Sequence, residues 1–475
     1  MMHAPLRDAR TREPRGSGRR RSRRLALMAV AAGTAVALTA CGSDGDSGKD
    51  KGGDAKKPSA SAAQSSSGVR LPKLDGQTVK IAAVWSGAER DAFEKVLADF
   101  GKRTGAKTEY VAAQDPVIGF LESKIAGGGQ PDVAMLPQVG AIQQAVEREW
   151  AKPVGAEAQA ELKKNYGQGW QELGAVDGKQ YGVYFKAANK SLVWYNTAVF
   201  DNAGAEVPTS WADFLKTAQT VADSGVTPVS VAGADGWTLT DWFENIYLSQ
   251  AGPEKYDKLA RHEIKWTDPS VKQALTTLGQ LFGKPDLLAG GAKGALATEF
   301  PASVTQTFTG GDQPKAGMVF EADFVGINIA ETDAKIGSDA KVFPFPAVGS
   351  GKAPAVVGGD AAVALKDSKG AQALLTYLAS PEAAAIWAKT GGFISPNKAL
   401  DTSAYPNDVQ RGIAEALIKA GDDIRYDMSD QMPQSFGGSP NKGEWKALQD
   451  FLAKPKDVAA IQQRLERDAA KAYKD

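Results

Sequence analysis

VKIAAVWSGAERDAFEKVLADF, residues 79–100, carries the clearest secondary-structure signal of the chain. Its first part, 79–85, is rich in apolar and β-branched side chains, which is typical of a buried strand. Ser86 follows as a favourable helix N-cap. The next apolar residues recur three, four and seven positions apart, the pattern of one helix face: Phe93, Val96, Leu97 and Phe100. The stretch therefore predicts a strand that leads directly into an amphipathic helix.

The alternation of strand and helix continues along the chain. Residues 108–112 and 132–136 are expected to be short strands, the second after the chain-breaking GGGQP of 127–131. Further strand candidates are 181–196, 226–231, 317–329, 342–345 and 355–365, and the last hundred residues have a helical pattern. This order favours an α/β fold with mostly parallel strands.

The N-terminal 40 residues have the composition of an export leader. Nine arginines fall within the first 24 positions, and residues 25–40 carry no charge. That apolar run is shorter than the roughly 20 residues of a membrane span. We therefore expect a signal peptide over residues 1–40. Ser22–Arg24 weakly resembles a twin-arginine export signal, and the export route stays open.

Cys41 is the only cysteine of the 475 residues and ends the string LTAC, 38–41. This string resembles a bacterial lipobox, in which the cysteine thiol is acylated and the peptide is cut before it. We expect Cys41 to carry a lipid such as palmitate on the extracytoplasmic face of the cell membrane; a buried structural cysteine is the alternative. Residues 42–70 are mainly Gly, Ser, Ala, Asp and Lys, so 41–70 is expected to be the lipidated cysteine and a disordered tether.

The composition excludes several functions. The leader holds nine of the 56 Lys/Arg and two of the 56 Asp/Glu, so cleavage before Cys41 leaves 47 basic and 54 acidic residues. This acidic excess argues against nucleic acid or anionic lipid as ligand. With only His3 and His262 in the chain, histidine-rich metal sites and Ser-His-Asp chemistry are not expected. We expect no catalytic residues, metal or cofactor.

The order of short motifs resembles family 1 of the extracellular solute-binding proteins, the maltose-binding-protein-like receptors of carbohydrate ABC importers. The resemblance begins at the strand and helix of 79–100 and runs to the C-terminus. It is carried by Val84–Glu89, Lys102–Gly105, Gly129–Val133, Tyr181–Val183, Trp194–Asn196, Pro208–Trp211, Gly317–Phe320, Gly358–Gly359 and Gly392–Pro396.

The resemblance implies a two-lobed, periplasmic-binding-protein-like fold of type II, with ligand in the cleft between two α/β lobes. Lobe closure about hinge crossings would trap the ligand. The motifs place crossings near 186–189, 357–360 and 394–397. Lobe I would then comprise 71–187 plus 359–395, and lobe II would comprise 188–358 plus 396–475.

A sugar needs hydrogen-bonding side chains for its hydroxyls and aromatic faces for its C–H patches. Trp85, Ser86 and Glu89 lie at the first strand-to-helix junction, where open α/β sheets place ligands. Alternatively, Trp85 is a core residue and Glu89 only complements the helix dipole. By resemblance, Gln138 after the strand 132–136 is a further contact.

The remaining candidates come from the predicted second lobe and the crossings. Asn189 stands where a relative has an acidic contact, and Trp237 and Asp241 supply a stacking face and a carboxylate. Phe320–Phe324 departs from the family's usual Gly-Trp, which leaves Asp323 and Phe324 as candidates. At the second crossing we expect contacts from Gly359 and Asp360. In the C-terminal region, 425–426 and 430–436 resemble the family's cleft loop, so Arg425 or Asp430 is expected to bind ligand, and a surface ion pair is equally plausible.

The sequence thus predicts a monomeric receptor that binds a mono- or oligosaccharide and delivers it to ABC permease subunits. Three alternatives stay open. A glycoside hydrolase would need paired carboxylates, such as Glu321 with Asp323 or Asp422 with Asp423. A binding protein for a non-sugar solute and a structural or adhesive lipoprotein are the other two.

Overall fold

The computed structural model describes residues 68–114, 116–420 and 424–474. The predicted signal peptide, Cys41 and the tether up to residue 67 lie outside these residues. Val69, at the end of the predicted tether, packs against the body and donates its backbone N–H to Glu382 (3.1 Å). The folded body therefore begins slightly before the predicted residue 71. Within the described residues, each helix is too short or too polar to cross a bilayer.

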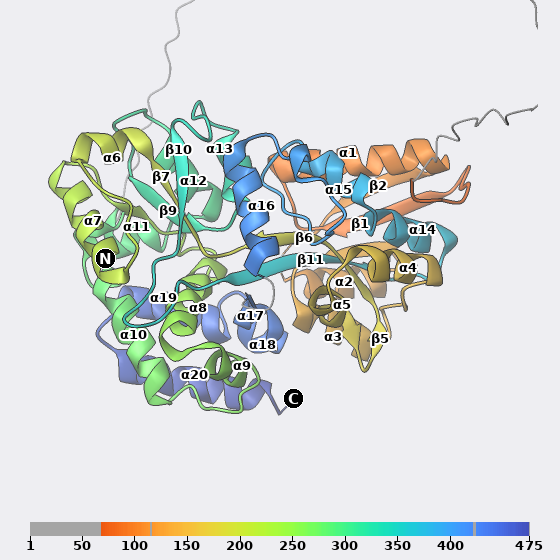
Figure 1. Cartoon of the computed structure of the whole chain (residues 1–475). Coiled ribbons are helices and arrows are strands. Elements are labelled where there is room, and N and C mark those ends of the chain that lie inside the picture. Colours follow the sequence, from red (N-terminus) through yellow and green to blue (C-terminus); the bar gives the residue numbers. More distant parts are fainter. Residues whose placement is uncertain (1–67, 115, 421–423, 475) are drawn as a thin grey trace, which may run out of the picture. The chain divides into compact units, whose positions relative to one another are not determined.

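The first sheet contains six strands in the order β12-β11-β3-β1-β2, with β6 paired to β11 (Figure 1). The strand β1 pairs in parallel with β2 and β3, while β11 runs antiparallel to β3 and β6. Because β12 also runs parallel to β11, three of the five pairings in this sheet are parallel, as predicted. In the second sheet two of the three pairings are antiparallel, so the predicted mostly parallel order does not hold there. The bounds are β1 Thr78–Ala83, β2 Lys107–Ala112, β3 Val133–Leu136, β6 Gly182–Asn189, β11 Val356–Ala364 and β12 Arg425–Tyr426.

Helix α1, Gly87–Thr104, follows β1 as predicted. Its buried face includes the four residues that showed helical spacing, together with Ala92 and Thr104. Gly105 ends the helix in a left-handed conformation (φ 80°), which glycine adopts without a Cβ clash. The helix is thus fixed against the sheet, and its N-terminus lies at the carboxyl end of β1.

The helices and the short hairpin nearest to the first sheet share its hydrophobic core, which includes Phe93, Phe185 and Trp387. These elements are α2 Val117–Ala126, α3 Val139–Glu147, α4 Ala156–Asn165, α5 Gln168–Leu173, β4 Ala175–Val176, β5 Lys179–Gln180, α14 Lys369–Leu378 and α15 Pro381–Ala388.

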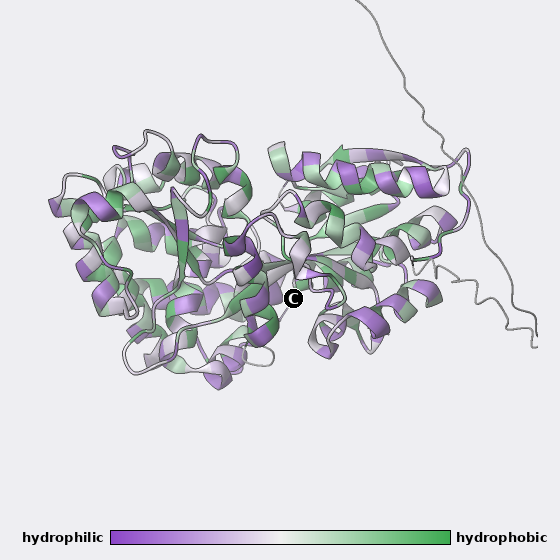
Figure 2. Ribbon diagram, turned by 45° about the horizontal axis from the view of Figure 1, so that its top comes forward, coloured by the Kyte–Doolittle hydropathy of each residue, from purple (hydrophilic) through white to green (hydrophobic). Residues whose placement is uncertain are grey.

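The second sheet has four strands in the order β10-β7-β9-β8. These are β7 Leu192–Asn196, β8 Val229–Ser230, β9 Met318–Glu321 and β10 Ala340–Pro344. A separate core, with Trp242, Trp266 and Phe320, surrounds this sheet. The ribbon of both sheets is largely hydrophobic, whereas the outer helices mix hydrophilic and hydrophobic residues (Figure 2).

Most remaining helices pack around the second sheet or at its border. They are α6 Thr197–Ala203, α7 Trp211–Asp223, α8 Trp237–Ala251, α9 Pro253–Ala260, α10 Pro269–Phe282, α11 Gly291–Ala295, α12 Phe300–Phe308, α13 Val325–Ile329, α16 Asp408–Ala420, α17 Met428–Gln431, α18 Gln434–Gly437, α19 Gly443–Ala453 and α20 Val458–Ala472. Two 3-10 turns, Pro285–Leu287 and Thr402–Ala404, complete the described elements.

The chain passes between the two sheets at the end of β6. Only Lys190 and Ser191 separate β6, in the first sheet, from β7, in the second. The strand β12 pairs with β11 in the first sheet, although it lies in the range predicted for lobe II. The predicted lobe boundaries themselves stay a prediction.

Candidate ligand-binding cleft

A cavity of about 310 Å³ lies between strand ends of the first sheet and helices of the second core. From the first sheet come the segments after β1 and β3 and the facing parts of β6 and β11. The other wall comes from the start of α8, the start of α12, and segments near α13, α17 and α19. The lining residues are Val84, Trp85, Ser86, Glu89, Pro137, Gln138, Lys186, Ala188, Lys190, Asp235, Trp237, Phe300, Pro301, Phe324, Gly359, Asp360, Ser429, Asp430 and Trp445.

On the first wall, Trp85 and Glu89 flank a buried lysine. The Lys186 ammonium donates to Glu89 Oε1 (2.6 Å) and lies 5.7 Å from the Trp85 ring centroid and 5.1 Å from that of Phe324. Burial lowers the pKa of Lys186, but the charges of Glu89, Asp360 and Asp323 outweigh it and raise the pKa. The lysine therefore stays charged, and Glu89 is held toward the cavity.

Trp85 belongs to the core as well as to the wall. It is 5% exposed, and its ring meets those of Phe93 and Trp387 edge-on, with 4.9 Å between centroids in each pair. The tryptophan therefore offers the cavity only a small part of its surface. Ser86, next to it, is exposed.

The second wall is aromatic. The Trp237 centroid lies 5.5 Å from that of Phe300 and 6.1 Å from that of Phe324, and the two phenylalanine rings meet edge-on at 5.3 Å. Asp235 fixes this group, because its Oδ2 accepts a hydrogen bond from the Phe300 backbone N–H (2.6 Å). Three rings from three separate segments thus form one apolar surface. The same cavity is also lined by Gln138 and by the carboxylates of Glu89, Asp235, Asp360 and Asp430.

A second lysine, Lys190, lies at the base of the cleft. Its ammonium is 3.3 Å from Asp241 Oδ1 and 3.7 Å from Asp430 Oδ2, and it donates a short hydrogen bond to Asp427. Burial lowers the pKa of Lys190, but the surrounding carboxylates raise it well above its ordinary value. Burial alone would raise the pKa of Asp427, yet Lys190 and neighbouring hydrogen bonds lower it to about 2.

Eight of the twelve predicted contact residues line this cavity, and four do not. Asp241 is fully buried beneath Lys190, and Asp323 is 2% exposed and accepts the Asn189 backbone N–H (2.7 Å). The Asn189 side chain accepts the Ser191 N–H instead (3.1 Å). Arg425 forms an ion pair with Asp257 (3.0 Å), as the alternative interpretation expected.

Sequence reasoning missed several lining residues, chiefly Lys186, Lys190, Asp235, Phe300 and Trp445, whereas Asp430 belongs to the C-terminal segment that was expected to reach the cleft. A signal was available for the lysines, since both interrupt the otherwise apolar and aromatic stretch YFKAANKSLVWY, 184–195. A charge that is buried in a strand needs a partner, and such partners gather at functional sites. The other residues come from loops and helix starts that have no comparable pattern.

Of the carboxylates considered for hydrolysis, the pair that the structure describes, Glu321 and Asp323, does not line the cavity. Glu321 and Asp323 are almost fully buried outside the cavity wall, and Asp422 and Asp423 lie outside the described residues. Burial raises the pKa of Glu321 to about 8. Glu321 and Asp323 therefore do not provide the two carboxyl groups that would flank a bound sugar in a hydrolase.

Asp241, Glu244 and Asp427 place carboxylate oxygens within 4.8 Å of one another. Glu244 accepts hydrogen bonds from Tyr256 Oη (2.6 Å) and from the backbone N–H of Ser429 (2.9 Å). Asp427 accepts from Lys190, so protein donors already occupy the cluster.

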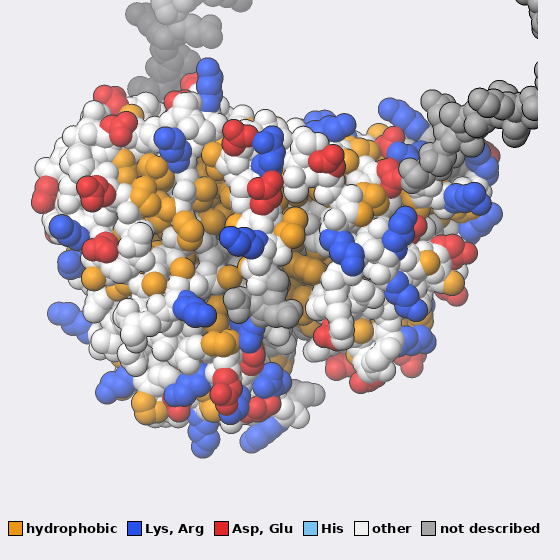
Figure 3. Space-filling view, viewed as in Figure 1, with side chains coloured by type: hydrophobic (Ala, Val, Ile, Leu, Met, Phe, Trp, Pro, Cys, Tyr) orange, Lys and Arg blue, Asp and Glu red, His pale blue; other side chains and the backbone are white. Residues whose placement is uncertain are grey.

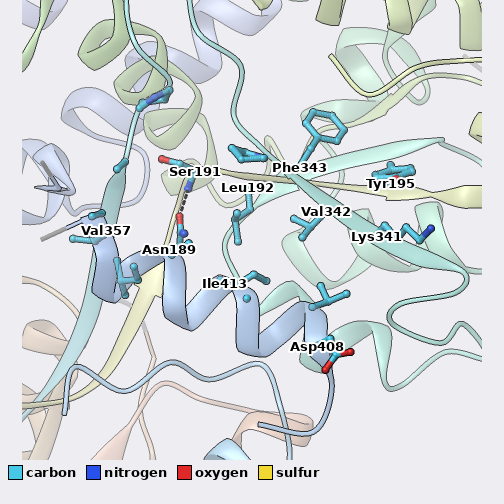
Figure 4. Close-up of a pocket in the computed structure, with 18 residues that line it drawn as sticks. Asn189, Ser191, Leu192, Tyr195, Lys341, Val342, Phe343, Val357, Asp408 and Ile413 are labelled. Atoms are coloured by element: carbon cyan, nitrogen blue, oxygen red, sulfur yellow. Dashed lines mark hydrogen bonds between the residues drawn. The ribbon is translucent and has the colours of Figure 1, made fainter. Parts of the chain in front are cut away.

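A larger cavity, of about 500 Å³, lies beside α16 and the strands β7 and β10 (Figure 4). Its wall is mostly apolar, with Val342, Phe343 and Ile413 among the lining residues, and it includes the Asn189–Ser191 hydrogen bond. Hydrophobic side chains gather on this face of the molecule (Figure 3). Because it brings few polar groups together, this cavity is less suited to a polyhydroxyl solute than the cleft.

Comparison with known proteins identifies the sequence family. Residues 86–385 match the family described as bacterial extracellular solute-binding protein. The chain is 34% identical over 385 residues to the osmoprotective compounds-binding protein GgtB of Synechocystis, covering 80% of this chain and 89% of that protein. It is 31% identical over 407 residues to the alpha-glucosides-binding periplasmic protein AglE of Rhizobium meliloti, covering 82% and 86%.

Solved structures agree on the fold. The solute receptor AcbH, described as exclusive for β-D-galactopyranose, superposes with a TM-score of 0.72 at 21% identity, over 84% of this chain and 99% of that one. Maltose-bound MalE3 of T. maritima gives 0.68 at 14% identity, over 83% and 99%. These similarities confirm the predicted two-lobed fold of type II, and the sequence match over most of the chain shows that this protein is a member of the bacterial extracellular solute-binding protein family.

Proposed function

We propose that the protein is the sugar receptor of an ABC importer, which binds a mono- or oligosaccharide in the cleft and delivers it to the membrane permease. The observation that carries the proposal is the composition of the cavity wall. The rings of Trp237, Phe300 and Phe324 form one surface, and Glu89 and Gln138 lie on the opposite wall. Flat rings suit the C–H faces of a sugar, and carboxylates and amides suit its hydroxyls.

The charges of the wall favour a neutral solute. Lys186 is paired with Glu89, and Lys190 is paired with Asp427, so both ammonium groups are neutralised within the protein. Asp235 and Asp360 add negative charge to the wall. Among the described lining residues both cations are already paired, so this field disfavours an anionic ligand, whereas the hydroxyl groups of a sugar can donate to the carboxylates. A volume of about 310 Å³ is at the small end for a ligand site, which favours one or two sugar rings.

The names of relatives support the α-linked glucosides as the first ligands to try. AglE is an alpha-glucosides-binding protein, and GgtB binds osmoprotective compounds. We therefore propose α-linked glucosides as the ligand class of this protein. We also propose that the lobes close about the chain crossing at Lys190 and Ser191. The predicted contacts that line the cleft are proposed as the ligand contacts.

Membrane attachment through Cys41 is part of the same proposal. Residues 42–67 would tether the receptor near its permease, where the monomer could capture solute and dock. Cys41→Ser should release a binding-competent protein from the membrane and impair uptake with an unchanged Kd. Retention of the variant in the membrane fraction would contradict the anchor.

The test of the function is a ligand panel measured by thermal shift and then by calorimetry. Maltose, trehalose and sucrose represent α-glucosides; cellobiose and diacetylchitobiose represent β-linked sugars; spermidine represents a non-sugar solute. A ligand that binds only the native state raises Tm in proportion to the logarithm of its concentration over Kd. A shift with a sugar supports the proposal, and a shift with spermidine alone would overturn its sugar part.

A further inference from the structure

Lys190 joins four separate elements around the cleft. Its backbone follows β6, and its N–H donates to the Val356 carbonyl at the start of β11 (2.8 Å). Its carbonyl accepts from Asn245 Nδ2 of α8 (2.9 Å). Its ammonium reaches Asp241 of α8 and Asp427 and Asp430 of the segment after β12. Both ends of this residue are therefore fixed at the passage from one sheet to the other.

We propose that Lys190 is a positioning residue for solute binding, which holds Trp237 and Asp430 in the cleft wall. The inference rests on the proposed function, because it assigns a role to the lysine in that same site. Lys190 is itself only 9% exposed, so its main contacts are with protein groups.

The contact to Asp430 runs through Asp427. Asp427 caps α17, since its Oδ1 accepts the Asp430 backbone N–H (3.0 Å) and the Ser429 hydroxyl (2.7 Å). Lys190 binds the other carboxylate oxygen of Asp427. One ammonium therefore fixes the cap that presents the Asp430 side chain to the cavity, and it also lies near that side chain directly.

The contact to Trp237 runs through α8. Trp237 begins this helix, and Asp241 lies one turn later on the same face. The ammonium binds Asp241 and lies 5.6 Å from the Trp237 ring centroid. This distance is within the range in which a cation is attracted to a ring face. Lys190 thus restrains the first helical turn and the ring that the turn carries.

The surroundings of Lys190 are strongly acidic. Four carboxylates act on its charge: Asp241 of α8, Glu321 of β9, Asp427 at the cap of α17 and Asp430 within α17. Glu244 and Glu444 in turn act on Asp427, and Asp360 acts on Asp430. The other cation at the cleft, Lys186, is paired with Glu89. A buried charge without its partner is strongly destabilising. Removal of Lys190 should therefore raise the pKa of Asp427 and loosen the turn around it.

The experiment compares Lys190→Met with Lys190→Arg in the mature protein, using the panel sugar that binds the wild type most tightly. The Met variant should raise Kd at least tenfold, and the Arg variant should retain most of the affinity. Lys366→Met is the matched control, because Lys366 pairs with the nearly buried Asp132 (3.3 Å) away from the cleft. It should leave Kd unchanged. If Lys190→Met does not fold, Lys190→Gln replaces it.

Two readouts separate positioning from a general loss of stability. The ratio of the Kd of the Lys190→Met variant to that of the wild type should increase from pH 5.5 to 8.5. As the pH rises, Asp427 ionises beside Asp241, and the variant has no ammonium group at position 190 to compensate this charge. A constant ratio would overturn the proposal. The second readout needs no sugar: hydrogen exchange at the Asp430 amide should be faster in the Lys190→Met variant than in the wild type. Unchanged exchange would overturn the positioning role of Lys190. If no panel sugar binds the wild type, that result counts against the proposed function alone, and the exchange measurement still tests the role of Lys190.

Discussion

Trp237→Ala is the sharpest single test of the aromatic wall. A tryptophan buries about 150–250 Å² in full. The Trp237 ring already contacts Phe300, Phe324 and the Lys190 ammonium and is partly exposed, so we assign about 70 Å² of it to a ligand. At about 25 cal/mol per Å², its loss costs about 1.8 kcal/mol of binding free energy, or roughly a 20-fold increase in Kd.

The assay is isothermal titration with the panel sugar that binds the wild type most tightly. Trp150→Ala is the matched control, since this partly exposed ring contacts Arg148 (4.9 Å from guanidinium to centroid) and does not line the cleft. Both variants should unfold cooperatively. A change of less than threefold at Trp237, or an equal loss at Trp150, would refute the assignment of this ring to the site.

Two further predictions concern stability. Burial raises the pKa of Glu321 to about 8, so the native state binds this proton more tightly than the unfolded chain, and stability should fall as pH rises from about 4.5 to 8. Glu321→Gln should flatten that decline in urea denaturation, and an unchanged slope would contradict the reasoning. Gly359→Ala would place a Cβ 2.5 Å from the Lys186 carbonyl oxygen and should cost about 1–3 kcal/mol of unfolding free energy by denaturant titration. Gly167→Ala, where a Cβ has no neighbour within 4 Å, should cost less, and equal losses would argue against the clash.

The parts of the fold that could be predicted are those with local patterns. Residues 79–100 became β1 and α1 because burial of one helix face requires the observed periodicity. Trp85, Ser86 and Glu89 reached the cavity for the same reason, since the junction of a strand and a helix lies at the sheet edge. Local sequence therefore predicted three of the eight expected contacts that line the cavity.

The rest depends on contacts between distant segments. Asp241 and Asp427 are 0% exposed, their carboxylate oxygens lie within 4.8 Å of each other, and both pair with Lys190. No pattern near either residue predicts that meeting. Asn189 is predicted only by resemblance to a relative, but its side chain accepts a hydrogen bond from the backbone two residues later and lines the other cavity. The antiparallel direction of β11 was equally invisible, because sheet pairing is a tertiary property.

The pairing of β11 also bears on when the protein can fold. Leu136 of β3 lies against Ala361, and the next strand, β12, is supplied by Arg425 and Tyr426. During synthesis from the N-terminus, β1, β2 and β3 are complete long before β11 and β12. Until β11 is available, β3 has an unpaired, apolar edge. Contacts that close such long loops form slowly. The first sheet can therefore be completed only after residues 425–426 are available, when nearly the whole polypeptide has emerged.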